Sequence, residues 1–216
     1  MDDKNRGIEI TRQPVGFSIT VGGNQVSTEG KAIDVRLENN QANVYMLVDC
    51  SNSMAGYKLG QAKQGVMDFA AKALASGYRV GLISFDTTAN LITEPLDDIQ
   101  ALQPAIRAMK ISGSTNLAAA IKMAHEQLKK LEGMRTVVVA TDGEPDNVPA
   151  SLKAAQQAKN EGIDFITIGT DDADLKFLER LATRKELGSK VTKESFASTI
   201  ASASDLLPSP KGIIKR

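Results

Sequence analysis

Oxygen-bearing side chains stand at alternate positions in one short stretch of the chain, at Asp49, Ser51 and Ser53. Alternate placement in an extended turn lets the two hydroxyls point the same way. One carboxylate and two hydroxyls are hard oxygen donors with little net charge. They suit a small cation such as Mg²⁺, which keeps several waters and accepts few protein ligands. The stretch therefore predicts part of a metal site, with Ser51 and Ser53 as direct ligands.

The residues before Asp49 must position this loop. Residues 44–48 (VYMLV) form a run of large and β-branched apolar residues, bounded by polar turn formers. So short a run predicts a strand buried on both faces, as in a parallel sheet. Asp49 then lies at the carboxyl end of the strand, where open α/β sheets place their ligand sites.

After residue 43 the chain alternates predicted strands with predicted helices, an order that predicts a doubly wound, mostly parallel α/β sheet with helices on both faces. A short turn before residues 89–93 makes that segment a short antiparallel edge strand. Asp97 or Asp98 caps the helix that follows, and Pro104 predicts that this helix starts late or kinks. Ser195 caps a final helix that ends before Pro208. The other predicted helices span residues 58–76, 116–132, 149–161 and 174–183, and the other predicted strands span residues 79–85, 136–141, 164–169 and 190–192.

The stretch Asp49-Cys50-Ser51-Asn52-Ser53 resembles the signature of the metal-ion-dependent adhesion site of von Willebrand factor A (vWA) domains. The resemblance implies a threonine from a second loop and an aspartate after a later strand. Thr115 (in ISGSTNL) and Asp142 (in VVVATDG) occur in that order. The resemblance covers about residues 43–207. It implies that the strand ending at Asp49 lies beside the strand ending at Asp142, with both aspartates facing one ion.

The resemblance also implies roles for these residues. Asp49 and Asp142 supply negative charge, often through bound water, and Thr115 coordinates directly in one conformation and through water in another. The ion is Mg²⁺, with Mn²⁺ or Ca²⁺ as alternatives. One coordination position is left for the acidic side chain of a partner protein. Gly113 and Gly143 are expected to allow positive φ or a close backbone approach beside the site.

Residues 1–42 differ from the rest of the chain. Alternating apolar and polar residues at 7–11, 17–21, 25–28 and 33–37 predict a small antiparallel β extension, with a hairpin turn at Gly22-Gly23. This extension covers an edge or end of the main domain, or it docks a partner. We therefore expect an extension over residues 1–42, a main domain over residues 43–207 and a tail over residues 208–216.

Composition argues against several classes of partner. Lysine plus arginine equals aspartate plus glutamate, at 26 each, and tryptophan is absent, so neither nucleic acid nor an acidic membrane surface is an expected partner. Cys50 is the single cysteine, which excludes an intrachain disulfide. No secretory signal or membrane-spanning run is recognised, and the expected location is cytoplasmic. The resemblance is to the prokaryotic intracellular type, whose partners include AAA+ ATPases and signalling proteins.

Three readings of the site remain open. In the first, the domain is a non-enzymatic adaptor that binds a partner's acidic residue through the ion. In the second it is a metal-dependent hydrolase or phosphotransferase, although Ser51 stands where haloacid-dehalogenase-like enzymes need a second aspartate and no nucleophile elbow occurs. In the third it is a degenerate domain that keeps the fold, binds no metal and works as a scaffold. Apart from these three functions, Ser51 and Ser53 could merely cap the following helix while Asp49 and Asp142 are turn residues. Cys50, Met54, His125 and Asp146 are interpreted as packing or solvated residues.

Overall fold

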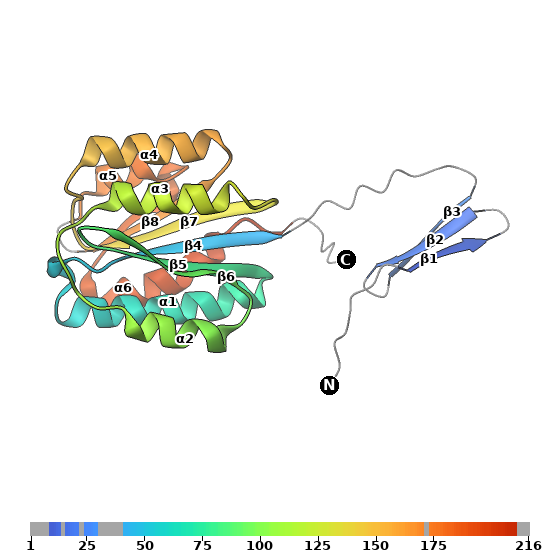
Figure 1. The fold of residues 1–216 in the computed structure, drawn as a ribbon, viewed down its shortest axis with the longest axis horizontal. Helices are drawn as coiled ribbons and strands as arrows, with labels where there is room; N and C mark the ends of the chain where they lie inside the picture. Colours follow the sequence, from blue (N-terminus) through green and yellow to red (C-terminus); the bar gives the residue numbers. More distant parts are fainter. Residues whose placement is uncertain (1–8, 14–15, 22–23, 30–40, 171–172, 211–216) are drawn as a thin grey trace. The chain divides into compact units, whose positions relative to one another are not determined.

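A computed structural model describes residues 9–13, 16–21, 24–29, 41–170 and 173–210 (Figure 1). The chain divides into two compact units between residues 38 and 39. Each unit has its own sheet. In the part of the chain that the structure describes, no helix is long and apolar enough to cross a membrane.

The first unit contains the predicted antiparallel extension. Strands β1 (Glu9–Gln13), β2 (Gly16–Val21) and β3 (Asn24–Glu29) pair in that order, and both pairs are antiparallel. Ile19 lies opposite Val26, so the predicted hairpin is present. The alternating residues 33–37 lie outside the described residues, and the role of the extension stays a prediction.

The second unit is built on a six-stranded sheet in the order β6-β5-β4-β7-β8-β9. All neighbouring strands are parallel except β5 and β6, which are antiparallel. This arrangement confirms the predicted doubly wound fold with one antiparallel edge strand. The strands are β4 (Ala42–Asp49), β5 (Tyr78–Phe85), β6 (Ala89–Leu96), β7 (Met134–Thr141), β8 (Asp164–Thr170) and β9 (Gly188–Val191).

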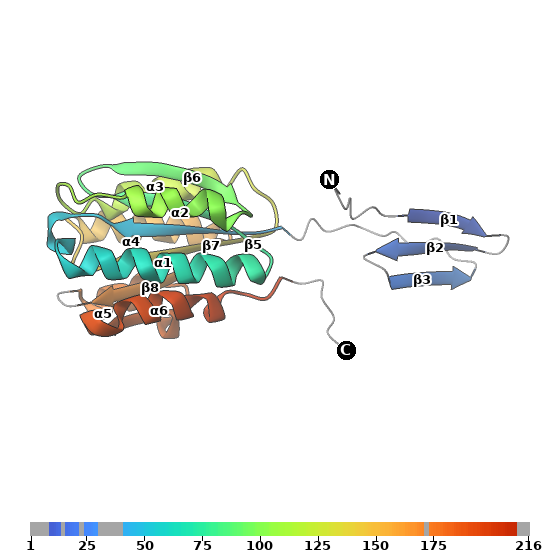
Figure 2. The same ribbon diagram turned by 90° about the horizontal axis from the view of Figure 1, so that it is seen from below.

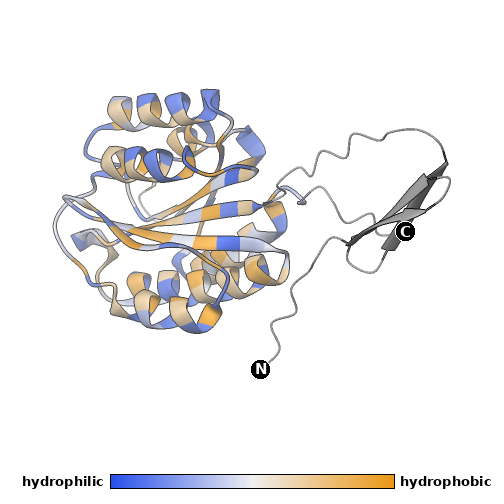
Figure 3. Ribbon diagram, turned by 45° about the vertical axis from the view of Figure 1, so that its right-hand side comes forward, coloured by the Kyte–Doolittle hydropathy of each residue, from blue (hydrophilic) through white to orange (hydrophobic). Residues whose placement is uncertain are grey.

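Helices cover both faces of this sheet (Figures 1 and 2). Every residue of β4 is buried. Val44, Met46 and Val48 belong to one hydrophobic core and Tyr45 and Leu47 to the other, because alternate side chains of a strand point to opposite faces. Figure 3 shows hydrophobic residues along the strands between the two helical layers. The first layer holds α1 (Tyr57–Ala75), α2 (Ile99–Ala108) and α6 (Phe196–Ser202), and the second holds α3 (Leu117–Leu128), α4 (Val148–Asn160) and α5 (Leu175–Leu181).

The position of β4 creates the point at which a ligand site is expected. The chain passes from β4 to β5 on one side and later returns to add β7 on the other side. Val48 is paired with Ala140, so β4 and β7 end at the same level of the sheet. The winding reverses between these two strands, and the carboxyl ends at such a reversal are where open α/β sheets place their ligand sites.

Two predicted helices differ from the structure at their ends. Helix α2 begins at Ile99 rather than late, because Asp98 Oδ1 accepts the amide of Gln100 at 2.8 Å, and Pro104 lies inside it. The final helix is not continuous: α6 ends at Ser202 and a 3₁₀ segment, η4 (Ala203–Leu206), follows. Hydroxyls at these positions bond to carbonyls of the preceding turn, as Ser204 does with Ala201 at 2.8 Å, and this weakens a regular helix.

Two further boundaries are corrected by the structure. Ser195 does not cap α6 with its side chain. Strand β6 is longer than the predicted segment of residues 89–93, because register shifts against β5 let the pairing continue to Leu96. Pro95 is tolerated there because β6 is an edge strand.

Pro208, the first residue of the predicted tail, accepts a hydrogen bond from the Tyr78 hydroxyl at 2.5 Å through its carbonyl.

Candidate metal centre

The predicted residues lie on three loops at the carboxyl ends of β4 and β7. Backbone hydrogen bonds join the loops: Asn52 N donates to Gly113 O at 3.1 Å, and Ser112 N donates to Cys50 O at 2.8 Å. Asp146 N donates to Thr115 O at 3.0 Å and attaches the loop after β7. The three segments that the sequence singles out therefore adjoin one another, as predicted.

Asp49, the last residue of β4, is fully buried. Its Oδ1 accepts the amide of Ser51 at 2.8 Å, and its Oδ2 accepts the Thr141 hydroxyl at 2.6 Å. Burial raises the pKa of Asp49 above 3.8, its hydrogen bonds with Ser51 and Thr141 oppose the shift, and the charge of Asp142 adds to it. Both donors are neutral, so ionised Asp49 is held without a cation contact among the described residues.

Ser51, Ser53 and Asp142 form a continuous chain of polar contacts. The hydroxyl oxygens of Ser51 and Ser53 are 2.9 Å apart, and the Ser53 hydroxyl donates to Asp142 Oδ1 at 2.8 Å. Neither serine caps a helix with its side chain: the 3₁₀ segment η1 (Asn52–Met54) has no side-chain cap, and α1 is preceded by Gly56. The reading of these serines as helix caps is therefore wrong.

Lys58 is a member of this cluster that sequence reasoning missed. Its Nζ lies 2.6 Å from Asp142 Oδ2, and the side chains of Lys58 and Asp142 are 20% and 0% exposed. Lys58 is the second residue of α1, where the helix dipole disfavours a cation. A lysine at a predicted helix start, in a turn with no acidic residue, was the signal that could have found it.

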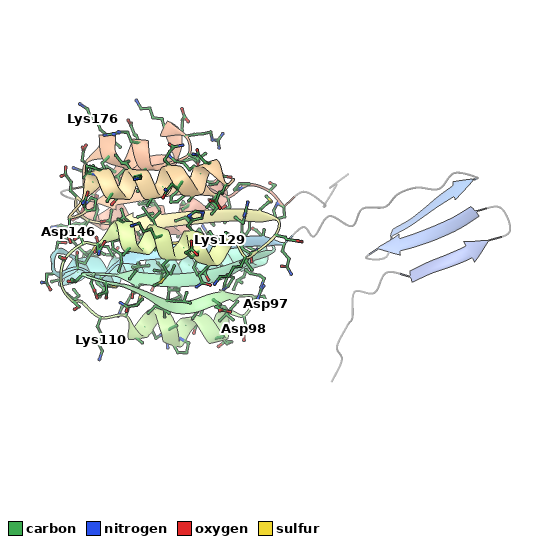
Figure 4. The ribbon with its side chains drawn as sticks, turned by 45° about the horizontal axis from the view of Figure 1, so that its top comes forward. Asp97, Asp98, Lys110, Lys129, Asp146 and Lys176 are labelled. Atoms are coloured by element: carbon green, nitrogen blue, oxygen red, sulfur yellow. The ribbon has the colours of Figure 1, made fainter. Side chains whose placement is uncertain are left out.

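Thr115 lies on the predicted loop, just before α3, but its hydroxyl forms no hydrogen bond to any described residue. Its backbone is held by Asp146, whose carboxylate oxygens each lie 3.2 Å from Thr115 N. Asp146 also accepts the Ser114 hydroxyl at 2.7 Å. Figure 4 labels Asp146 at the end of the domain opposite Asp97 and Asp98. The interpretation of Asp146 as a solvated loop charge is incomplete, because this exposed residue also fixes the Thr115 loop.

The loop that carries Thr115 also rests on the turn between β5 and β6. Gly113 has φ of 57°, and a Cβ there would collide with the Thr87 hydroxyl. Asn116 N donates to Asp86 O at 2.7 Å, and the Asn116 side chain caps α3 at Ala119 N. The prediction for Gly113 is confirmed. The prediction for Gly143 is wrong, because a Cβ at that residue would meet nothing within 4 Å and its φ is not positive.

Cys50 and Met54 are packing residues, both almost completely buried. Burial raises the pKa of the Cys50 thiol to about 12; the charges of Asp49 and Asp86 add to this rise, and Lys63 opposes it. A thiol with so high a pKa stays protonated near neutral pH, which removes it as a nucleophile. The Nε2 atom of the sole histidine, His125, lies 2.9 Å from a carboxylate oxygen of Glu161, between α3 and α4.

The donor set fits a small divalent cation. Neighbouring ligands of octahedral Mg²⁺, each at 2.0–2.1 Å from the ion, lie about 2.9 Å apart. The contacts from Ser51 to Ser53 and from Ser53 to Asp142, at 2.9 and 2.8 Å, have this spacing. Among the described residues, no three His, Cys, Asp or Glu side chains gather around one point. A cation here must therefore depend on hydroxyl oxygens as well as on carboxylates.

The family model of the von Willebrand factor type A domain matches residues 43–206, which include the whole cluster. The chain belongs to the vWA domain family. Domains of this family often mediate protein–protein interactions. The family match agrees with the extent predicted from the sequence motifs, residues 43–207.

Relatives of this vWA domain include uncharacterised proteins. A UPF0353 protein of Mycolicibacterium vanbaalenii is 26% identical, over 66% of this chain and 48% of the relative. A UPF0353 protein of Mycobacterium tuberculosis is 25% identical over the same shares. The chain thus spans about half the length of the curated relatives it matches.

Solved structures share the vWA fold at low sequence identity. The vWF domain of the type V pili tip protein Mfa5 from Porphyromonas gingivalis has a TM-score of 0.70 at 17% identity, covering 77% of this chain and 94% of that one. The pilus adhesin SpaC from Lactobacillus rhamnosus GG has a TM-score of 0.68 at 14% identity, covering 95% and 35%. BatB from Bacteroides thetaiotaomicron has a TM-score of 0.60 at 17% identity, covering 76% and 99%. At these identities the likeness concerns the fold alone.

Proposed function

We propose that this vWA domain is a divalent-metal-dependent protein interaction module. Asp49, Ser51, Ser53, Thr115 and Asp142 hold the cation, with Mg²⁺ as the expected ion. When bound, the ion supplies positive charge that hydroxyl ligands do not cancel, and so it attracts a carboxylate of a partner protein. The observation that carries this proposal is the chain of contacts from Ser51 through Ser53 to Asp142, which joins two loops of distant sequence into one oxygen cluster.

The chain's own residues prepare this cluster in three ways. The strand ends place both aspartates at the reversal point of the sheet. Neutral donors orient Asp49, so that its charge is available to a cation. Asp146 and the Thr87 turn hold Thr115 beside the serine loop. Exposed Ser53 and Asn52 leave the cluster open to a partner on its outer side.

A hydrolase or phosphotransferase is the weaker candidate. The position two residues after Asp49 carries Ser51 rather than a second acid, Cys50 is protonated, and His125 lies between α3 and α4 beside Glu161. We therefore propose a non-enzymatic role. Assays with generic phosphate and ester substrates test this point: metal-dependent turnover that is abolished by Asp49→Asn would revive the enzymatic reading.

The proposed interaction is tested with an array of peptides that differ in a single Asp or Glu. The array is probed with the whole chain in Mg²⁺, in chelator, and with a Ser51→Ala, Ser53→Ala variant in Mg²⁺. We expect carboxylate-bearing peptides to be retained by the wild type in Mg²⁺ alone. Equal retention in chelator and by the variant would leave the metal-free scaffold as the function.

The identity of the partner belongs to the proposal as well. An AAA+ ATPase or a signalling protein that presents Asp or Glu is the partner we expect, as the resemblance to the vWA family implies. The cytoplasmic location stays a prediction, as does the expectation that nucleic acids and membranes are not partners. Mfa5 and SpaC, by contrast, are described as pilus proteins.

A further inference from the structure

The two oxygens of the Asp142 carboxylate have different partners. Oδ1 accepts the Ser53 hydroxyl at 2.8 Å, and Oδ2 contacts the Lys58 ammonium at 2.6 Å. The carboxylate is fully buried, whereas the Lys58 side chain is one-fifth exposed at 20%. A cation of the protein itself therefore contacts one of the two carboxylate oxygens of a residue that is expected to bind a metal ion.

The location of Lys58 is not explained by the helix that carries it. Lys58 lies in the first turn of α1, where the positive end of the helix dipole repels an ammonium group. An exposed lysine there would cost stability, and lysine side chains lose much rotational freedom when they are fixed. The contact with Asp142 offsets part of both costs.

We propose that Lys58 is an internal counter-ion that competes with the divalent cation for Asp142. Without a metal ion, the ammonium balances the charge of Asp142 and links the start of α1 to the loop after β7. When a divalent ion binds, Lys58 leaves Asp142, a movement that its flexible stem permits. This inference rests on the proposed metal site and adds that Lys58 sets how much metal is needed to fill it.

Electrostatics gives the expected size of the effect. Even with the screening of water, a unit charge about 4 Å from a divalent ion changes the affinity of the ion by more than about tenfold. Replacing Lys58 with a neutral residue should therefore strengthen binding, although it removes a stabilising contact. A residue that only stabilises the fold would weaken or not change metal binding when replaced.

The test is calorimetric titration of MgCl₂ into the whole chain as wild type, Lys58→Met and Lys58→Gln. Glutamine keeps a hydrogen-bond donor towards Asp142 and serves if the methionine variant folds poorly. Lys72→Met is the matched control, because Lys72 is exposed on the same helix about 21 Å further along its axis and carries the same charge. Melting temperatures in chelator and in Mg²⁺ provide a second measurement.

We expect the Kd for Mg²⁺ to fall about tenfold or more in both Lys58 variants and to stay within about twofold in Lys72→Met. In chelator, the Lys58 variants should have a lower melting temperature than the wild type. Added Mg²⁺ should raise their melting temperature by more than it raises that of the wild type. Binding by the Lys58 variants alone would also support the inference, since the lysine would then exclude the ion from the wild type.

Two results would overturn the inference, and they differ in what they say about the metal site. If the wild type binds Mg²⁺ and the Lys58 variants bind it equally or more weakly, Lys58 is no competitor and the proposed function stands. If neither the wild type nor either Lys58 variant binds Mg²⁺ or Mn²⁺, the proposed metal site fails together with the inference.

Discussion

The two buried aspartates at the centre of the cluster are stabilised in different ways. Asp49 and Asp142 follow neighbouring strands at the same edge of the sheet and are 0% and 1% exposed. Asp49 is held by an amide and a hydroxyl, both neutral. Asp142 is held by a hydroxyl and by the ammonium of Lys58. Neutral hydrogen-bond donors therefore stabilise the carboxylate of Asp49, whereas an ion pair stabilises that of Asp142.

This difference indicates what each aspartate contributes to metal binding and to the stability of the fold. The Asp49 side is organised by neutral donors and leaves a buried negative charge only partly compensated. The Asp142 side already has its cation, which a metal ion must replace. Removing either carboxylate should abolish or weaken metal binding, but the two substitutions should change the stability of the metal-free chain in opposite directions.

Asp142→Ala should have the largest effect. It removes the carboxylate oxygens that the Lys58 ammonium and the Ser53 hydroxyl contact, and because Lys58 is 20% exposed the loss should be about 2 kcal/mol, below that of a fully buried pair. The melting temperature in chelator should fall by roughly 4–8 °C, and Mg²⁺ binding should vanish. An unchanged melting temperature would show that the ion pair does not stabilise the cluster.

Asp49→Asn should also impair Mg²⁺ binding, but it should stabilise the metal-free chain. Burial raises the pKa of Asp49, so its ionisation disfavours the folded state, and stability is lost progressively as the pH rises above 3.8 and through the raised pKa. Asparagine can still accept the Ser51 amide and can donate to Thr141. A higher melting temperature is expected at pH 7, and the difference from the wild type should shrink as the pH falls towards 3.8.

The comparison is measured by thermal unfolding in chelator between pH 4 and pH 8. Asp146→Asn, an exposed carboxylate of the same region, controls for the general loss of a negative charge. If Asp49→Asn destabilised the chain at every pH, the negative charge of Asp49 would stabilise the fold as that of Asp142 does. The contrast between the two aspartates would then disappear.

Asp146→Ala should have a smaller effect on Mg²⁺ affinity, because Asp146 touches the Thr115 backbone and not the cluster itself. Loss of its contacts with Ser114 and Thr115 frees the loop, at a cost of about 1 kcal/mol or about fivefold in Kd. Asp146→Asn should restore part of the affinity, since its amide oxygen can accept the same bonds. Glu144→Ala, an exposed neighbour, should leave the Kd unchanged.

Cys50→Ala should have the smallest effect on metal binding, with a change of less than about twofold in the Kd for Mg²⁺. Cys50 lies between Asp49 and Ser51, but its thiol is buried in the core and protonated, with a pKa of about 12. The smaller side chain leaves a cavity in the core, so the melting temperature should fall while the affinity for the metal stays the same. A large loss of affinity would mean that the sulfur takes part in the site.

Local signals in the sequence predict the loop that follows Asp49, but they do not predict the distant contacts of either aspartate: the Thr141 hydroxyl reaches Asp49 across 92 residues. The run before Asp49, the two serines after it and the alternation of strands and helices are local signals, and the strand, the loop and the sheet order follow them. The partners of Asp142 lie 84 and 89 residues away, so only the folded chain brings Lys58 to it. The same holds for Asp146 and Thr115, whose contact joins two loops across 31 residues. The break between α6 and η4 escapes prediction because hydroxyl-to-carbonyl bonds compete with helix propensity in that segment.

The most direct test of the metal site is a crystal of the chain grown with Mn²⁺ and examined by anomalous scattering. The account predicts one strong peak between the ends of β4 and β7, within about 2.3 Å of the hydroxyl oxygens of Ser51 and Ser53, with Lys58 turned away from Asp142. A well-ordered crystal with no peak there, and with Lys58 still in contact with Asp142, would contradict it.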